Sequence, residues 1–224
     1  MKRLDCENQL TALKSLSDIV GIDAELIWDD FLKYDFVTVY ENGRFLCDFL
    51  DYLYDSFLEY FAIRNIEINE VCWFHLSRTM HPELFRKHGI LPRKQAYMLL
   101  NQVDSTDINP CSPICTKECQ GPFAMLVKDI AFCPDKAGHH DYLRVPELME
   151  DIGLGSVYEA NGISLIIKFV FKPKFEAKHY LKHVVYYLYC CRHSGELDMY
   201  CNTCFNAEGI PVLPESILYI KEVK

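Results

Sequence analysis

The sequence contains no apolar run of roughly 18 residues, the length that a membrane-spanning helix needs. Residues 1–13 are too polar for a secretory signal peptide, so we expect a protein of a reducing compartment. Glycine and proline number only 10 each and are scattered, which excludes collagen-like and linker-like tracts. Basic residues are also scarce: 23 against 32 acidic residues leaves a net charge of −9, which argues against nucleic acids and anionic membranes as partners.

Several catalytic and cofactor-binding motifs are absent as well. The segment Gly153-Leu154-Gly155 lacks the third glycine and the preceding strand of a dinucleotide-binding fingerprint. The chain has neither a Gly-x-Ser-x-Gly nucleophile elbow nor a His-Glu-x-x-His zinc pair. These absences exclude the common dinucleotide-binding, serine-hydrolase and zinc-protease signatures.

The first 65 residues have the pattern of helices. Apolar residues recur at helical spacing over 10–19, and again over 45–61, where the pattern predicts an amphipathic helix of about four or five turns. Asn42-Gly43 marks a turn before it. We therefore predict a helical N-terminal extension over residues 1–65 and a second domain over residues 66–224.

The remainder mixes helical and strand patterns. A strand is expected from Ile66 to His75, followed by a helix that begins at Pro82 and ends at Gly89. Further helices are expected at 93–103, 123–132 and 146–152, and further strands at 163–171, 184–190 and 217–220. Because helices come first and strands mainly later, the pattern favours an α+β fold over an alternating doubly wound one.

Three short segments share an order that points to chemistry. The first predicted strand ends in His75-Leu76-Ser77-Arg78, and its following helix leads to Gly89-Ile90. Near the C-terminus, Pro214-Glu215 opens the last strand, and Tyr142 precedes the helix expected from Pro146. This set resembles the motifs of ADP-ribosyltransferases of the diphtheria-toxin and poly-ADP-ribose-polymerase type. Leu76 departs from that family, which often has glycine at its place.

The resemblance covers residues 66–224 and implies both a fold and a site. The implied fold is α+β with a split β-sheet core, which residues 1–65 would cover as a helical cap. The implied catalytic residues are His75, Tyr142 and Glu215, with NAD held as substrate by His75, Ser77, Arg78 and Tyr142. In this reading a histidine orients the ribose, a tyrosine stacks on nicotinamide and a glutamate stabilises the developing cation. No metal is needed at such a site.

The resemblance also implies a biological role. We expect a mono-ADP-ribosyltransferase-like enzyme that modifies a side chain of a protein acceptor. Without a signal peptide, it would be cytoplasmic, or a secreted bacterial effector delivered by a dedicated machine. The acceptor residue and the oligomeric state stay open, and an NAD glycohydrolase that passes the ribosyl group to water is an alternative.

The eleven cysteines suggest a different class of function. Cys111, Cys115 and Cys119 lie in a loop predicted over 104–122, and a second group contains Cys191, His193, Cys201 and Cys204. Four such ligands can hold structural zinc, although a single Cys-x2-Cys is a weak signal for it. If the cysteines bind zinc, the chain could be a non-enzymatic, zinc-stabilised interaction module. If they do not, they are buried free thiols, and the enzyme hypothesis is unaffected.

Overall fold

The structure is a computed structural model that describes residues 1–43, 48–104 and 121–223. The chain forms two compact units that are interleaved along the sequence: unit 1 is Met1–Cys72, Leu126–His139 and Phe171–Thr203, and unit 2 is Trp73–Met125, His140–Val170 and Cys204–Lys224. This division differs from the predicted boundary after residue 65, because the helical unit recruits two later segments of the chain. Within the described ranges, no helix is long and apolar enough to cross a membrane.

Unit 1 is mainly helical. In chain order it contains β1 (Arg3–Leu4), α1 (Gln9–Val20), the π-helix η1 (Leu26–Phe31), α2 (Phe36–Gly43), α3 (Phe49–Tyr60), the 3-10 helix η3 (Lys128–Phe132), α6 (Pro134–Ala137), α9 (Ala177–His193) and the 3-10 turn η4 (Met199–Cys201). Helix α9 packs against α1 and α3, and these three helices enclose the core of the unit. The predicted helix over 45–61 is confirmed as α3, apart from residues 45–47, which lie outside the described ranges.

The expected strand over 184–190 is wrong, because these residues belong to helix α9. Its β-branched and aromatic residues favour a strand locally, but tertiary packing overrides that preference. The buried positions cover a broad face of the helix: Tyr180, Leu181, Val184, Val185, Tyr187, Leu188, Tyr189 and Cys190. A helix that is apolar over most of its circumference is typical of a protein interior.

Unit 2 is built around a sheet. Its elements are β2 (Glu70–Thr79, whose first residues belong to unit 1), α4 (Glu83–His88), α5 (Arg93–Asp104), β3 (Phe123–Met125), α7 (Glu147–Asp151), α8 (Gly155–Asn161), β4 (Ile163–Phe171, whose last residue belongs to unit 1), β5 (Cys204–Asn206), the 3-10 turn η5 (Pro214–Ser216) and β6 (Ile217–Glu222). The strand predictions at 163–171 and 217–220 are confirmed, and so are the helices beginning near 82, 93 and 146.

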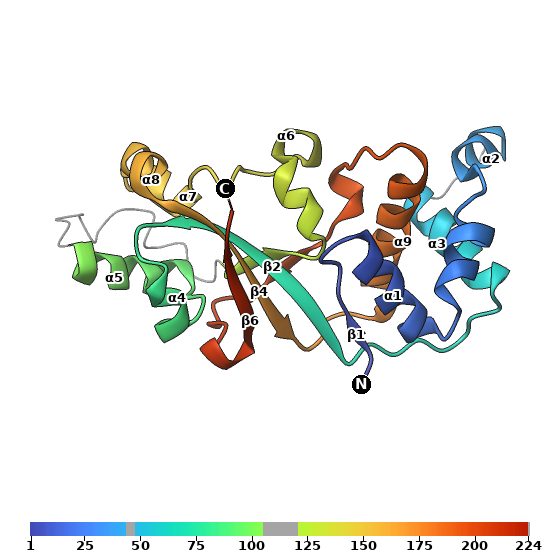
Figure 1. Ribbon diagram of the computed structural model, residues 1–224, viewed down its shortest axis with the longest axis horizontal. Coiled ribbons are helices and arrows are strands. Elements are labelled where there is room, and N and C mark those ends of the chain that lie inside the picture. The colour runs from blue at the N-terminus through green and yellow to red at the C-terminus, as the bar shows by residue number, and fades with distance from the viewer. Residues whose placement is uncertain (44–47, 105–120, 224) are drawn as a thin grey trace. The chain divides into compact units, whose positions relative to one another are not determined.

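The sheet has the strand order β5-β3-β2-β4-β6, and β1 pairs in parallel with the start of β2. Antiparallel ladders join β2 to β3, β3 to β5, and β4 to β6. Figure 1 shows β2, β4 and β6 lying side by side in unit 2. The structure therefore confirms a mixed helix and sheet fold with an open, mainly antiparallel sheet, while the split-sheet core stays a prediction.

The helix expected over 123–132 is wrong at its start. Phe123–Met125 forms strand β3, and only Lys128–Phe132 is helical, as a 3-10 turn. Strand β3 pairs through Met125 with Phe74 of β2 and with Cys204 of β5. Because β3 has ladder partners on both sides, the backbone of this short segment is satisfied as a strand.

Candidate functional site

His75 lies in the middle of β2 and is partly buried. Its Nδ1 donates a hydrogen bond to the carbonyl oxygen of Phe123, 2.7 Å away. Burial lowers the pKa of His75, against a smaller opposing effect of this bond. The imidazole is therefore neutral at pH 7, and its Nε2 keeps a lone pair that can accept a hydrogen bond.

Side chains of β2 alternate between the two faces of the sheet. Trp73 packs against Phe205 with ring centroids 5.3 Å apart, and Phe169 contacts the same ring at 5.3 Å. By alternation, His75 and Ser77 lie on this face with Trp73. The structure thus brings the predicted residues His75 and Ser77 together on one face of one strand.

Arg78 lies on the face of the sheet opposite His75, and its side chain donates hydrogen bonds to the end of helix α8. Its Nε and Nη2 donate to the carbonyl oxygens of Tyr158 and Glu159, at 2.9 and 2.7 Å. Its Nη1 donates to Ser164 Oγ at 2.9 Å and to the Leu143 carbonyl oxygen at 3.4 Å. The carbonyl groups at the end of a helix need such donors. These contacts indicate a structural role for Arg78, and pyrophosphate binding by its guanidinium stays a prediction.

Tyr142 lies in the turn before α7. Its hydroxyl donates to Glu147 Oε1 at 3.3 Å, and its ring centroid lies 5.0 Å from that of His140. Burial, and then Glu147, raise the pKa of Tyr142 to about 12, and Cys204 adds to the effect. Cys204 faces Met125 across the ladder, and Met125 faces Phe74, so Cys204 lies on the face opposite His75. These contacts do not unite Tyr142 with His75, and the predicted role of Tyr142 stays untested.

Glu215 lies exposed in the turn η5, directly before strand β6. Helix α4 packs against this turn. The same helix carries Phe85, whose ring centroid lies 6.1 Å from that of His75. Helix α4 therefore has contacts both with His75 and with the turn that carries Glu215.

A backbone bridge fixes this arrangement. The amide of Ile90 donates to the Val212 carbonyl oxygen and the amide of Val212 donates to the Ile90 carbonyl oxygen, each at 2.9 Å. Gly89 precedes the bridge with φ 74° and ψ −159°, a region open essentially to glycine alone. A Cβ on Gly89 would collide with the Val212 carbonyl oxygen, so the close approach of the two segments requires glycine.

Lys168 is a buried charged residue that was not among those predicted from the sequence to be functional. This lysine is only 6% exposed within β4, and its Nζ lies 5.6 Å from the Phe74 ring centroid and 5.7 Å from that of Tyr219. The available signal was a lone lysine inside the apolar run Ile163–Phe171. A buried cation between aromatic rings is stabilised by their negative faces, and it lies on the Phe74 side of the sheet, opposite His75.

The structure describes only the second of the two cysteine groups that were considered as zinc sites. Cys111, Cys115 and Cys119 lie outside the described residues. The buried thiols of Cys190 and Cys201 hydrogen-bond to each other, which lowers the pKa of Cys190 and, together with burial, raises that of Cys201. His193 Nε2 donates to the Leu32 carbonyl oxygen at 2.8 Å. Within the described ranges, no three His, Cys, Asp or Glu residues form a group that could hold a metal ion.

Chelator treatment is expected to leave the melting temperature unchanged, because the cysteines are expected to be free thiols. A structural zinc site would supply folding free energy, so its removal would lower the melting temperature. The measurement is a thermal melt with and without EDTA, together with the metal content of the purified chain. A fall of more than about 5 °C, with about one zinc per chain beforehand, would support the zinc-stabilised module.

Replacing His75 with alanine is expected to lower NAD turnover at least about tenfold, or about 1.4 kcal/mol of transition-state stabilisation. Loss of the bond to Phe123 should cost only about 1 kcal/mol of unfolding free energy. His139→Ala is the matched control, because its Nε2 also bonds a backbone carbonyl oxygen, that of Ile130 at 3.0 Å. Equal losses of turnover in both variants would mean that His75 has a packing role only.

Acid is expected to weaken the fold from about pH 6.5 downward. Burial is the first cause that lowers the pKa of His75, His179 and His183 below the ordinary value of 6.5. Between the folded and unfolded pKa values the unfolded chain binds more protons, so the unfolding free energy falls as the pH falls. Urea unfolding at about pH 7.5 and about pH 5.5 measures this effect, and His183→Gln should reduce it. Greater stability at the lower pH would contradict the burial of these imidazoles.

Comparison of the chain with protein-family models, with curated proteins and with solved structures finds no match. The candidate site therefore stands on the residues and geometry described above.

Proposed function

We propose that the chain is an NAD-dependent mono-ADP-ribosyltransferase that modifies a side chain of a protein acceptor. One observation carries the proposal: the Ile90–Val212 bridge joins the end of the segment that resembles the family's first motif to the chain just before Pro214, where the segment that resembles the last motif begins. These segments lie more than a hundred residues apart in the sequence. Their meeting in one unit is what a shared substrate site requires, and local sequence does not impose it.

The side chains at this place suit a ribose. Neutral His75 offers an acceptor at Nε2, Ser77 offers a hydroxyl, and Glu215 offers an exposed carboxylate. Hydroxyl groups of a sugar donate to such acceptors, so this set of donors and acceptors fits a ribose diol. NAD, when bound, supplies a carbon–nitrogen bond whose cleavage releases nicotinamide.

In this proposal, the carboxylate of Glu215 stabilises the transition state of NAD cleavage electrostatically. Cleavage of a glycosidic bond passes through a cation-like sugar, and a nearby carboxylate stabilises the positive charge as it develops. His75 orients the ribose through its Nε2, since its Nδ1 is held by Phe123. A nucleophilic side chain of the acceptor then forms the new bond to the ribose carbon and loses its proton. Stacking by Tyr142 and phosphate binding by Arg78 would add to this scheme but are not needed for it.

The test is incubation of the purified chain with labelled NAD and a cell lysate. A labelled protein band is the result that the proposal predicts, and it should be absent with Glu215→Gln. Free ADP-ribose without a labelled band would identify an NAD glycohydrolase at the same site. If neither a labelled protein band nor free ADP-ribose is formed, both enzyme hypotheses are contradicted. The interaction module is then the remaining hypothesis.

A further inference from the structure

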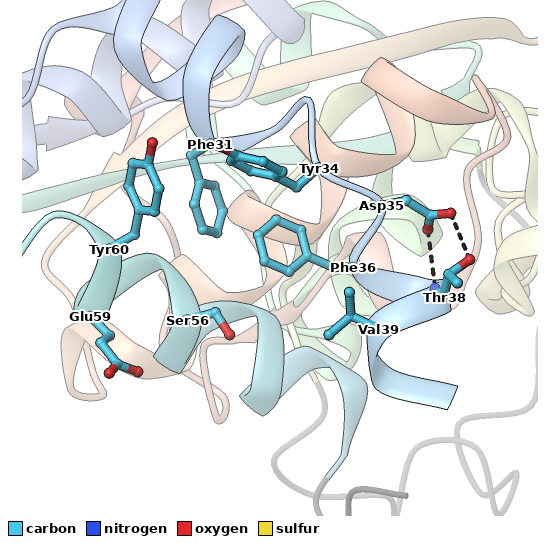
Figure 2. Close-up of a pocket in the computed structure, with 9 residues that line it drawn as sticks. All are labelled: Phe31, Tyr34, Asp35, Phe36, Thr38, Val39, Ser56, Glu59 and Tyr60. Atoms are coloured by element: carbon cyan, nitrogen blue, oxygen red, sulfur yellow. Dashed lines mark hydrogen bonds between the residues drawn. The ribbon is translucent and has the colours of Figure 1, made fainter. Parts of the chain in front are cut away.

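Unit 1 has an open pocket that the proposed NAD site does not use. Its volume is about 660 Å³. Figure 2 shows the side chains that line it, which come from η1, from the segment around the start of α2, and from α3: Phe31, Tyr34, Asp35, Phe36, Thr38, Val39, Ser56, Glu59 and Tyr60. All of these residues belong to unit 1.

Four aromatic rings form one wall. The ring centroid of Phe31 lies 4.7 Å from that of Phe36 and 5.6 Å from that of Tyr60, and Tyr34 lies 6.2 Å from Phe36 and 6.3 Å from Tyr60. Phe31 is fully buried, whereas Tyr34 and Tyr60 are 47% and 49% exposed. The inner ring anchors the wall, and the two tyrosines present aromatic surface to an incoming group.

Two carboxylates stand beside the rings. Asp35 accepts hydrogen bonds from the amide and the hydroxyl of Thr38, at 3.1 and 2.6 Å, and these bonds lower the pKa of Asp35 and keep it ionised. Glu59 is exposed on α3, and within the described part of the chain its carboxylate forms no ion pair or hydrogen bond. Aromatic faces and carboxylates attract the same kind of group, an organic cation.

The chain's own Lys33 already shows this attraction. Its Nζ lies 5.4 Å from the Tyr34 ring centroid and pairs with Asp30 Oδ1 at 3.3 Å. That ammonium is held at the edge of the cluster by Asp30, which is not among the residues that line the pocket. The negative charge of Glu59 is thus left without a counter-charge from Lys33.

We propose that this pocket docks a basic side chain, lysine or arginine, from an extended segment of a partner polypeptide. The aliphatic stem of that side chain would lie on the rings of the wall, while its charged end would meet Glu59, which lies at the other end of the lining from Asp35. The half-exposed lining favours a polypeptide over a free small molecule, because small ligands are usually buried over most of their surface. This inference stands independently of the proposed enzymatic function.

The probe is a fluorescent peptide of alternating leucine and lysine, titrated with the full chain and followed by anisotropy. Peptides with glutamine or glutamate in place of lysine should bind at least about fivefold more weakly. Glu59→Gln should weaken lysine-peptide binding by a similar factor, and Tyr60→Leu should do so while Tyr60→Phe should not. Glu25→Gln is the matched control, since Glu25 is an exposed carboxylate of unit 1 outside the pocket.

Three results would overturn the proposal. Equal binding of the glutamine peptide would mean that the pocket recognises apolar groups only. Equal weakening by Glu59→Gln and Glu25→Gln would mean that the acidic surface attracts the peptide without a specific site. Binding of tetramethylammonium without binding of the lysine peptide would assign the pocket to a small cation.

Discussion

Replacement of Glu215 by glutamine is expected to lower NAD turnover at least about a hundredfold, while NAD still binds within a few-fold of the parent affinity. Glutamine keeps the shape and the hydrogen-bonding oxygen of glutamate but removes its charge. The loss corresponds to about 2.7 kcal/mol, the size of contribution that one charged group positioned at the developing cation makes to the transition state. Release of nicotinamide and NAD binding by calorimetry measure the two quantities separately.

Glu222 provides the matched control at the other end of the same strand. Both carboxylates are exposed, and Glu215 precedes β6 whereas Glu222 is its last residue. Glu222 pairs with Leu165 at the far end of the ladder with β4, away from the turn that α4 contacts. Glu222→Gln should therefore turn over NAD like the parent. Exchanged phenotypes would assign the last motif to the wrong end of the strand.

Gly89→Ala is expected to lower the unfolding free energy by at least about 3 kcal/mol. The new Cβ would meet the Val212 carbonyl oxygen, and the positive φ of 74° adds backbone strain. Relief of the collision requires separation of Ile90 from Val212. NAD turnover should therefore also fall in whatever fraction of the protein stays folded. Urea unfolding gives the free energy, and nicotinamide release at low temperature gives the activity.

Gly153→Ala controls for a positive φ alone, without the collision and without the glycine-only backbone conformation of Gly89. Gly153 has a similar φ of 77°, but nothing lies within 4 Å of a Cβ placed on it. This variant should lose only about 1–2 kcal/mol, the usual cost of a left-handed backbone for alanine, and should keep its activity. If both alanine variants lose equal stability, the collision with Val212 is relieved without cost and the bridge does not constrain the site.

Strong periodic segments of the sequence predicted the fold well. The apolar run Ile163–Phe171 and the terminal strand from Ile217 are in the sheet, and α3 occupies most of the expected amphipathic helix. In each of these the local preference of the residues agrees with their packing in the fold. Such agreement is why single-sequence patterns were sufficient there.

The remaining assignments depended on contacts between distant residues. The run Val184–Cys190 has strand-forming residues, yet it lies in a buried helix because α1 and α3 surround it. Phe123 was assigned to a helix, yet ladder partners on β2 and β5 draw its segment into the sheet. Neither set of partners is close in the sequence, so no local pattern reveals them.

The same limit applies to the candidate site. The sequence identified His75 and Glu215 by motif, and the structure adds the bridge that joins their segments. Arg78 was expected to bind phosphate, whereas its donors are engaged with the carbonyl groups of Tyr158 and Glu159. The type of a residue indicates its chemistry, but the partners that surround it decide whether that chemistry is available.

The central claim is that His75 and Glu215 act on one NAD ribose, and a double-variant cycle tests it most directly. The measurement is nicotinamide release from NAD by the purified parent, His75→Ala, Glu215→Gln and the double variant, each with the same cell lysate as the source of acceptor and with the release by the lysate alone subtracted. Residues that act as one unit are not additive, so the double variant should be slower than Glu215→Gln alone by less than about threefold. A loss equal to the product of the two single losses, about a thousandfold, would contradict a shared site, and a parent that releases no nicotinamide would contradict the proposed function itself.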